Sequence, residues 1–306
     1  MVRFIIQRLL GVIPVLFGVT LIIFFMLRLI PGNPVILSLG TSATPSEVHL
    51  LEVQLGLNKP LWVQYFTYIG GLLHGNLGLS MQSGLPVTTE LSQRFPATLQ
   101  LALAALVIAV VLGYIFGILA SLKPNGLLAR SIVIVSTIFL AVPQFWLGLI
   151  LIMVFSLILR WLPVFGYGGL SHLILPALSV GLVAAAVNIR VIRTAMVEVL
   201  GADYIRTARS KGLKPRLVIM KHALRNALIP TITIIGLQLG FLLGGTVIVE
   251  QLFGWPGVGS LLISAIEARD YTLVQGGVLY LALMFIFANL LVDILYALID
   301  PQVKFS

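Results

Sequence analysis

The chain has 306 residues, of which 59% are hydrophobic and only 9% are charged, and its mean hydropathy is +1.10. Soluble domains carry about 25% charged residues, and a domain this poor in charge would expose large apolar patches to water. The composition therefore excludes an ordinary soluble enzyme, a disordered chain and a fibrous protein, and it indicates an integral membrane protein. Because the sequence contains no cysteine, disulfides, thiolate metal sites and cysteine nucleophiles are also excluded.

The first long apolar segment, residues 9–30, could be a cleaved signal peptide or a transmembrane helix, since Arg3 and Arg8 precede it. The segment is longer than the apolar part of a signal peptide, and no small-x-small cleavage pattern follows it directly. We therefore expect an uncleaved span.

Five further segments are long and apolar enough to cross a bilayer, which takes about 20 helical residues. In chain order they are residues 98–122, 131–159, 173–189, 227–249 and 273–299. Together with the first segment, they predict an all-α, polytopic membrane protein with six transmembrane helices. Pro143 and Pro176 lie within the third and fourth spans and can kink them.

Basic residues set the expected orientation of these spans. If the N-terminus is cytoplasmic, 14 of the 19 Lys and Arg residues fall on the cytoplasmic side, as expected for a membrane protein. We therefore expect both termini in the cytoplasm. The expected parts are a first helix with a large outer loop, a five-helix core and a cytoplasmic tail, over residues 1–94, 95–299 and 300–306.

The outer loop, residues 31–94, is far longer than the other connections and is rich in Pro and Gly. Two helix-like stretches, around residues 46–55 and 61–73, lie within it, and Ser46 is the expected cap of the first. The loop could shield the bundle or form a docking surface for an external partner.

The connection at residues 190–225 carries most of the excess charge of the chain. It has nine basic side chains and two acidic ones, Glu198 and Asp203, for a net charge of +7. Basic loops fix topology and attract anionic lipid. Two or three arginines would suffice for topology, so the larger number favours a docking element.

Within this loop, helix signals predict a short helix that turns sharply into another. Asp203 is the expected N-cap, and residues 204–211 follow as the helix. Gly212 is placed for a left-handed residue that ends a helix, and Arg209 and Lys211 complement its dipole. Pro215 suits the first turn of the next helix.

Two sets of glycines could let transmembrane helices approach closely. Gly113 and Gly117 are four residues apart, and Gly236, Gly240 and Gly244 repeat the same spacing. They could serve packing within one chain or pairing with a second.

Asp293 is the only acidic residue within a predicted span, and an intramembrane charge is a functional candidate by default. It lies seven residues before Asp300, close to the expected cytoplasmic surface. We therefore favour a structural role, with Asn289 as a possible polar partner.

Known catalytic patterns are missing from the sequence. There is no Gly-Lys dipeptide and so no phosphate-binding loop for ATP, and none of the four histidines pairs with another ligand at helical spacing. An intramembrane protease would need a nucleophile with a base, or paired aspartates, within the spans. A polytopic membrane protein without catalytic patterns could instead be a transporter. If it is not driven by a separate ATPase, it would be an ion-coupled secondary transporter, in which only Asp293 could carry a proton.

The basic loop carries a family resemblance. The segment DYIRTARSKGL, residues 203–213, resembles the EAA-type cytoplasmic motif of ABC importer permeases of the dipeptide, oligopeptide and nickel group. Arg206-Thr207-Ala208 stands in the EAA place, and Gly212 is the motif glycine. The motif glutamate is missing, Leu224 fits the general pattern that follows, and Arg225 replaces its proline.

The resemblance extends over nearly the whole chain, to the B-type permease of the group. The similar segments are residues 4–14, 26–34, 55–60, 75–80, 253–259, 269–271 and 300–301.

The resemblance implies the type I ABC importer permease fold and transport of peptides, glutathione, nickel chelates or sugars by alternating access. Its coupling helix would contact an ATPase subunit through Asp203, Tyr204, Arg206, Thr207, Ala208, Arg209, Lys211 and Gly212. The implied partners are a second, different permease chain, two ATP-binding subunits, an extracytoplasmic binding protein and membrane lipid, without nucleic acid. ATP and Mg would be used by the partner ATPases, with no cofactor or metal on this chain, in a bacterial or archaeal inner membrane.

Overall fold

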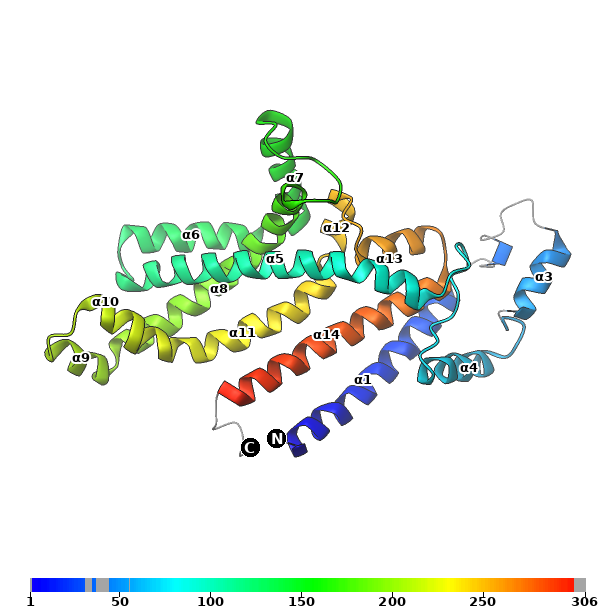
Figure 1. Cartoon of the computed structure of the whole chain (residues 1–306), viewed down its shortest axis with the longest axis horizontal. Coiled ribbons are helices and arrows are strands. Elements are labelled where there is room, and N and C mark those ends of the chain that lie inside the picture. Colours follow the sequence, from blue (N-terminus) through cyan, green and yellow to red (C-terminus); the bar gives the residue numbers. More distant parts are fainter. Residues whose placement is uncertain (1, 31–34, 37–43, 55, 300–306) are drawn as a thin grey trace. The chain divides into compact units, whose positions relative to one another are not determined.

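A computed structural model describes residues 2–30, 35–36, 44–54 and 56–299 of the chain (Figure 1). Over these residues the secondary structure is helical except for one isolated bridge, between Leu79 and Pro86. The chain divides into two compact units. The N-terminal unit comprises Val2–Thr98 and Pro256–Ile286, and the core unit comprises Leu99–Trp255 with the chain from Phe287 onward.

The helices of the N-terminal unit are α1 (Val2–Leu29), α3 (Pro45–Gln54), α4 (Leu61–Leu73), α13 (Val258–Glu267) and the first parts of α5 (Val87–Leu122) and α14 (Tyr271–Ile299). Four of them, α1, α5, α13 and α14, share an apolar cluster. The buried members of the cluster are Ile23, Leu27, Val87, Leu91, Val258, Ala265, Leu273 and Val274. Segments far apart in sequence, α1 and the start of α14, therefore share one core.

The expected cap of α3 was wrong by two residues. Thr44, not Ser46, caps the helix: the Glu47 backbone N–H donates to Thr44 Oγ1 (3.4 Å), and the Thr44 N–H donates to Glu47 Oε2 (2.8 Å). This reciprocal capping box places Pro45 in the first helical position, where a missing N–H costs nothing. The hydrogen bonds from Thr44 hold the pKa of the Glu47 carboxyl below its usual value.

The core unit is built around α8 (Leu170–Gly201), which packs against the helices before and after it in sequence (Figure 1). The other helices are α6 (Leu127–Ala141), α7 (Gln144–Leu151), α9 (Asp203–Ser210), α10 (Pro215–Leu217), α11 (Leu224–Gly245) and α12 (Val247–Phe253). Two π-helical stretches, η1 (Ile152–Ile158) and η2 (Val218–Ala223), continue α7 and α10.

Four described helices are long and apolar enough to cross a membrane alone, and as many as seven spans result if each bent helix pair counts as one. The spans expected at residues 9–30, 98–122, 173–189 and 273–299 lie within α1, α5, α8 and α14. The third expected span, residues 131–159, bends by 105° between Leu127–Ala141 and Gln144–Ile158, at the proline that the sequence marked as able to kink it. Pro143 lies at the break, since it has no N–H to continue the helix.

Gly113 and Gly117 bring α5 against α8 within this chain. A Cβ at Gly113 would lie 2.5 Å from Asn188 Cβ, and one at Gly117 would lie 2.8 Å from Ile192 Cβ. One helical turn earlier, Asn188 Nδ2 donates to the carbonyl of Ala109 (3.2 Å). The question left open by the sequence therefore has an answer for this pair: it serves packing inside the chain.

The three glycines of the second series, Gly236, Gly240 and Gly244, have different surroundings. A Cβ at Gly236 would overlap the side chain of Val292, so α11 and α14 approach closely there. Gly240 is buried, whereas Gly244 is exposed and a Cβ there would meet nothing within 4 Å. Only part of this series is needed for packing inside the chain.

The short helix α9 is amphipathic and lies on α8 and η2. Its inner face is Ile205, which has no exposed surface, and Ala208, which is 8% exposed. Both belong to an apolar cluster with Ile192, Met196 and Val218, among others. α9 is therefore fixed to the core unit by apolar burial rather than by charge.

Both ends of α9 can be compared with the sequence prediction. Asp203 was wrong as N-cap, because Ala202 holds that extended position and no side chain caps the helix. The helix covers residues 203–210 instead of 204–211. Gly212 has φ +75°, which confirms the left-handed glycine that ends the helix. Pro215 begins the next helix, as predicted.

We expect Gly113→Ala to lower the free energy of unfolding by about 1–3 kcal/mol, because the new methyl group overlaps Asn188 on the neighbouring helix. Thermal unfolding of the purified protein in detergent measures this. Gly244→Ala is the matched control and should be neutral or slightly stabilising, since its methyl group meets open space. Equal effects of the two substitutions would contradict the close approach at Gly113.

We expect Ala208→Leu to loosen α9 from α8, because the added side chain does not fit the buried inner face. Hydrogen exchange of the amides at residues 203–210 should become at least about tenfold faster, which corresponds to about 1.4 kcal/mol of lost local stability. Ser210→Leu, on an exposed position of the same helix, is the control. Unchanged exchange in Ala208→Leu would contradict the packing described for α9.

Candidate functional site

The outer face of α9 carries most of the side chains that the sequence predicted for a docking helix. Asp203, Tyr204, Arg206, Thr207 and Arg209 are all exposed. Lys211 and Gly212, which follow the helix, are exposed as well. Ala208 differs, because it belongs to the buried face and positions the helix instead of presenting a surface.

The charge on the outer face of α9 is predominantly positive, and its basic side chains are exposed to solvent. Arg206 Nη1 lies 3.6 Å from Asp203 Oδ1, with both side chains largely exposed, so water screens this pair and it contributes little to stability. The exposed basic residues of the connection are Arg190, Arg206, Arg209, Lys211, Lys214, Arg216, Lys221 and Arg225. The basic outer face of α9, with Arg206 and Arg209, suits an acidic partner.

Hydrogen bonds anchor the loop at two further points. Asn226 Nδ2 donates to the Tyr204 hydroxyl (2.8 Å), which joins α9 to α11. Arg193, on α8, donates from Nη2 to the carbonyl of Pro124 (3.4 Å) in the turn after α5. The outer face of α9 is therefore held by α8, α11 and the α5–α6 turn together.

The intramembrane polar pair is only partly described by geometry. Asn289 Oδ1 is buried and accepts no hydrogen bond from a described residue. Asp293, one turn further along α14, is half-buried. Their pairing remains a prediction.

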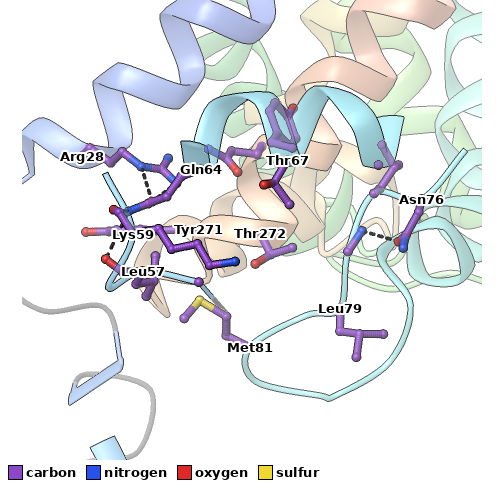
Figure 2. A pocket seen from close by; sticks show the side chains of 16 residues that line it. Arg28, Leu57, Lys59, Gln64, Thr67, Asn76, Leu79, Met81, Tyr271 and Thr272 are labelled. Atoms are coloured by element: carbon purple, nitrogen blue, oxygen red, sulfur yellow. Dashed lines mark hydrogen bonds between the residues drawn. The ribbon is translucent and has the colours of Figure 1, made fainter. Parts of the chain in front are cut away.

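A cavity of about 390 Å³ opens in the N-terminal unit, and we call it the Arg28 cavity (Figure 2). Its walls come from the end of α1, α4 with the turn before it, the loop at residues 76–81 and the first turns of α14. Two basic side chains, Arg28 and Lys59, line it. No acidic side chain is among the 16 described residues that line the cavity.

The side-chain amide of Gln64 and the backbone carbonyl of Phe24 hold Arg28 in place. Gln64 Oε1 accepts from Arg28 Nε (3.1 Å) and Nη2 (2.9 Å), and Gln64 Nε2 donates to the carbonyl oxygens of Leu57 and Lys59 (Figure 2). The Arg28 guanidinium carbon also lies 3.3 Å from the centre of the Phe24 ring, which gives a cation–π contact. The arginine is thus oriented without a carboxylate.

Three other lining residues carry polar atoms that have no hydrogen-bond partner among the described residues. They are the hydroxyls of Tyr68 and Tyr271 and the side-chain nitrogen of Gln275. Burial raises the pKa of Tyr68 to about 12, so its hydroxyl keeps its proton at neutral pH and can donate. Unpaired buried polar atoms are costly, and each needs an explanation.

The wall beside α14 is fixed by a buried carboxylate. Asp270, 1% exposed, accepts hydrogen bonds from the Ser80 hydroxyl (2.6 Å), the Gln82 N–H (3.3 Å) and the Leu273 N–H (3.0 Å). A Cβ at Gly78 would lie 2.6 Å from Thr272, so only glycine lets the loop approach α14 so closely. These contacts keep the loop against α14.

The sequence does not predict the Arg28 cavity. Arg28 lies in the first predicted span, and Asn76 and Tyr271 lie in segments that resemble the family, but nothing in the linear pattern brings these residues together. Among the described residues, no group of three or more His, Asp or Glu side chains could hold a metal ion.

Two family models match the chain. The model described as "Binding-protein-dependent transport system inner membrane component" covers residues 109–305, and the N-terminal model of the same systems covers residues 1–102. The first match contains α8, α9 and α11, with the basic loop between them.

Curated relatives are similar along their full length. The glutathione transport system permease protein GsiC of Escherichia coli strain K12 is 44% identical over 306 residues, which is all of both chains. The protein of the same name from Shigella boydii serotype 4 is 43% identical over the same span. These matches confirm the resemblance seen in the sequence.

Solved structures of the MetNI methionine ABC transporter in inward-facing conformations share the fold. Two of them align with TM-scores of 0.60 and 0.56 at 19% and 18% identity. They cover about 70% of this chain and 96–97% of the transporter chain. The fold class expected from the sequence, a type I importer permease, is confirmed. The chain therefore belongs to the family of binding-protein-dependent transport system inner membrane components, and it is a multi-pass permease subunit of an ATP-driven ABC importer, not an enzyme.

Proposed function

We propose that this permease imports small peptides of the glutathione class. The observation that carries the proposal is the 44% identity to a glutathione transport permease over the whole of both chains. The match includes the N-terminal unit as well as the core unit. Glutathione is a tripeptide with two carboxylates, so it also belongs to the peptide class that the resemblance implied.

The proposed assembly contains this chain, a second and different permease chain, two ATP-binding subunits and an extracytoplasmic binding protein. The ATP-binding subunits hold ATP and Mg, and this chain binds neither. Both termini and the basic loop lie in the cytoplasm, since the loop accounts for most of the positive charge of the chain.

We propose that α9 is the contact through which the ATP-binding subunits act. Its apolar face is sealed into the core unit, so a push on its polar face is transmitted to α8 and α11. The exposed arginines Arg206 and Arg209 offer charge-assisted hydrogen bonds to acidic side chains of a partner. ATP-driven closure of the partner subunits would then switch the permease between outward and inward openings.

The contact can be tested by reversing charge on the outer face of α9. We expect Arg206→Glu combined with Arg209→Glu to reduce ATP-dependent uptake at least about tenfold, because like charges would then face an acidic partner surface. Reconstituted vesicles that contain the complete transporter measure uptake and ATP hydrolysis together.

Lys221→Glu combined with Arg225→Glu is the matched control, because it makes the same change in net charge on exposed positions outside α9. We expect this control to keep most of the uptake. Normal uptake by the α9 variant, with its ATPase subunits still bound, would contradict the coupling role.

The substrate can be tested with the complete transporter and its binding protein. We expect ATP-dependent uptake of radiolabelled glutathione, and competition by unlabelled dipeptides at higher concentrations. Free glycine and nickel chelates are the controls. Uptake of a control solute in place of glutathione would contradict the proposed substrate class.

A further inference from the structure

We propose that the Arg28 cavity binds the free carboxylate of a small peptide, and that the transported solute is its occupant. The inference rests on the proposed function for the identity of the solute, and it adds a binding site on the N-terminal unit.

The charge of the cavity selects an anion. Arg28 and Lys59 contribute two positive charges, and no lining residue is acidic. Arg28 makes three hydrogen bonds, to Gln64 and to the carbonyl of Phe24, all of which leave its charge uncompensated by a carboxylate. The nearby carboxylate of Asp270 is buried and already accepts three hydrogen bonds.

The unpartnered polar groups select an acceptor. Gln275 is only 8% exposed, and its side-chain nitrogen donates to nothing among the described residues. The hydroxyls of Tyr68 and Tyr271 are also buried and have no hydrogen-bond partner among the described residues. A carboxylate has two oxygens that can accept about four hydrogen bonds, so it matches a set of donors that lack acceptors. The soft last torsion of glutamine lets the Gln275 amide turn toward a ligand, and rotation about the C–O bond lets each tyrosine hydroxyl aim its O–H.

The size and remaining walls suit a peptide. A volume of about 390 Å³ falls in the range of small-molecule sites, about 300–1,000 Å³. Leu57, Leu79 and Met81 supply an apolar wall, and the flexible thioether of methionine adapts to side chains of different shapes. A half-open cavity of this size can hold a small solute.

The test measures binding to the complete transporter without its binding protein, in nanodiscs of zwitterionic lipid, by titration calorimetry. The probes are glutathione, its diethyl ester and inorganic phosphate. We expect glutathione to bind at least tenfold more tightly than the ester, in which both carboxylates are blocked, and than phosphate. Equal binding of the ester or of phosphate would overturn the proposal.

Three variants each remove one feature of the cavity: Gln275→Leu and Tyr271→Phe remove a donor, and Lys59→Gln removes a positive charge. Each should weaken glutathione binding about tenfold, because hydrogen bonds to charged groups are among the strong ones. Gln275→Leu and Tyr271→Phe should leave the unfolding temperature unchanged or raised, since the lost atoms have no partner in the empty cavity. Wild-type affinity in all three variants would overturn the proposal.

Tyr65→Phe is the matched control on α4. Its hydroxyl lies 3.2 Å from Thr20 Oγ1 and does not line the cavity, so the substitution should lower stability slightly and leave glutathione binding unchanged. Variants that weaken binding of the binding protein, but not of glutathione, would place a protein carboxylate in the cavity and overturn the proposal.

Uptake in the presence of the binding protein separates this inference from the proposed function. Glutathione uptake without binding to the cavity would overturn the inference alone. Absence of glutathione uptake by the wild-type transporter would overturn the proposed substrate, and with it the occupant named here.

Discussion

The close approach of α5 and α8 is the contact on which the core unit depends. Small residues make it possible, because lipid tails are as apolar as the helices and association must come from tight packing and hydrogen bonds. Gly181 meets Ala105, Asn188 meets Gly113, and Ile192 meets Gly117. The contacts advance along both helices in the same direction, by about two turns and then one, so α5 and α8 run parallel. The buried hydrogen bond from Asn188 to the carbonyl of Ala109 fixes this register.

Parallel helices place their C-terminal ends together, and this explains the position of the basic loop. The turn after α5 and the end of α8 meet where Arg193 donates to the carbonyl of Pro124. α8 then continues to Gly201, and α9 begins at Asp203 and packs on an apolar cluster of the core unit. A short helix of eight residues would not be stable alone. The position of α9 therefore depends on the packing of α8 several turns away.

The two candidate sites differ in how far the sequence could predict them. The signals at Gly212 and Pro215 are local, because left-handed backbone and a fixed proline φ are properties of single residues. Asp203 was misjudged because several adjacent residues can hold a cap position, and packing of Ile205 and Ala208 sets the helix phase. The same competition moved the cap of α3 to Thr44. Burial of Ala208 was equally beyond the sequence, since its neighbours come from three other segments.

The sequence by itself determined the membrane class, the main helices, the basic loop and, by resemblance, the importer family. The length of apolar segments, the distribution of basic residues and the family motifs all lie along the linear sequence. What they predict does not depend on how the helices pack against one another. Only the tertiary structure decided that Gly113 serves packing inside the chain and that the helix through Pro143 is broken at a sharp angle. It alone assembled the Arg28 cavity, because Arg28, Gln64 and Tyr271 come from helices far apart in sequence. Burial and hydrogen-bond pairing are properties of neighbours in space, and the linear order of residues does not contain them.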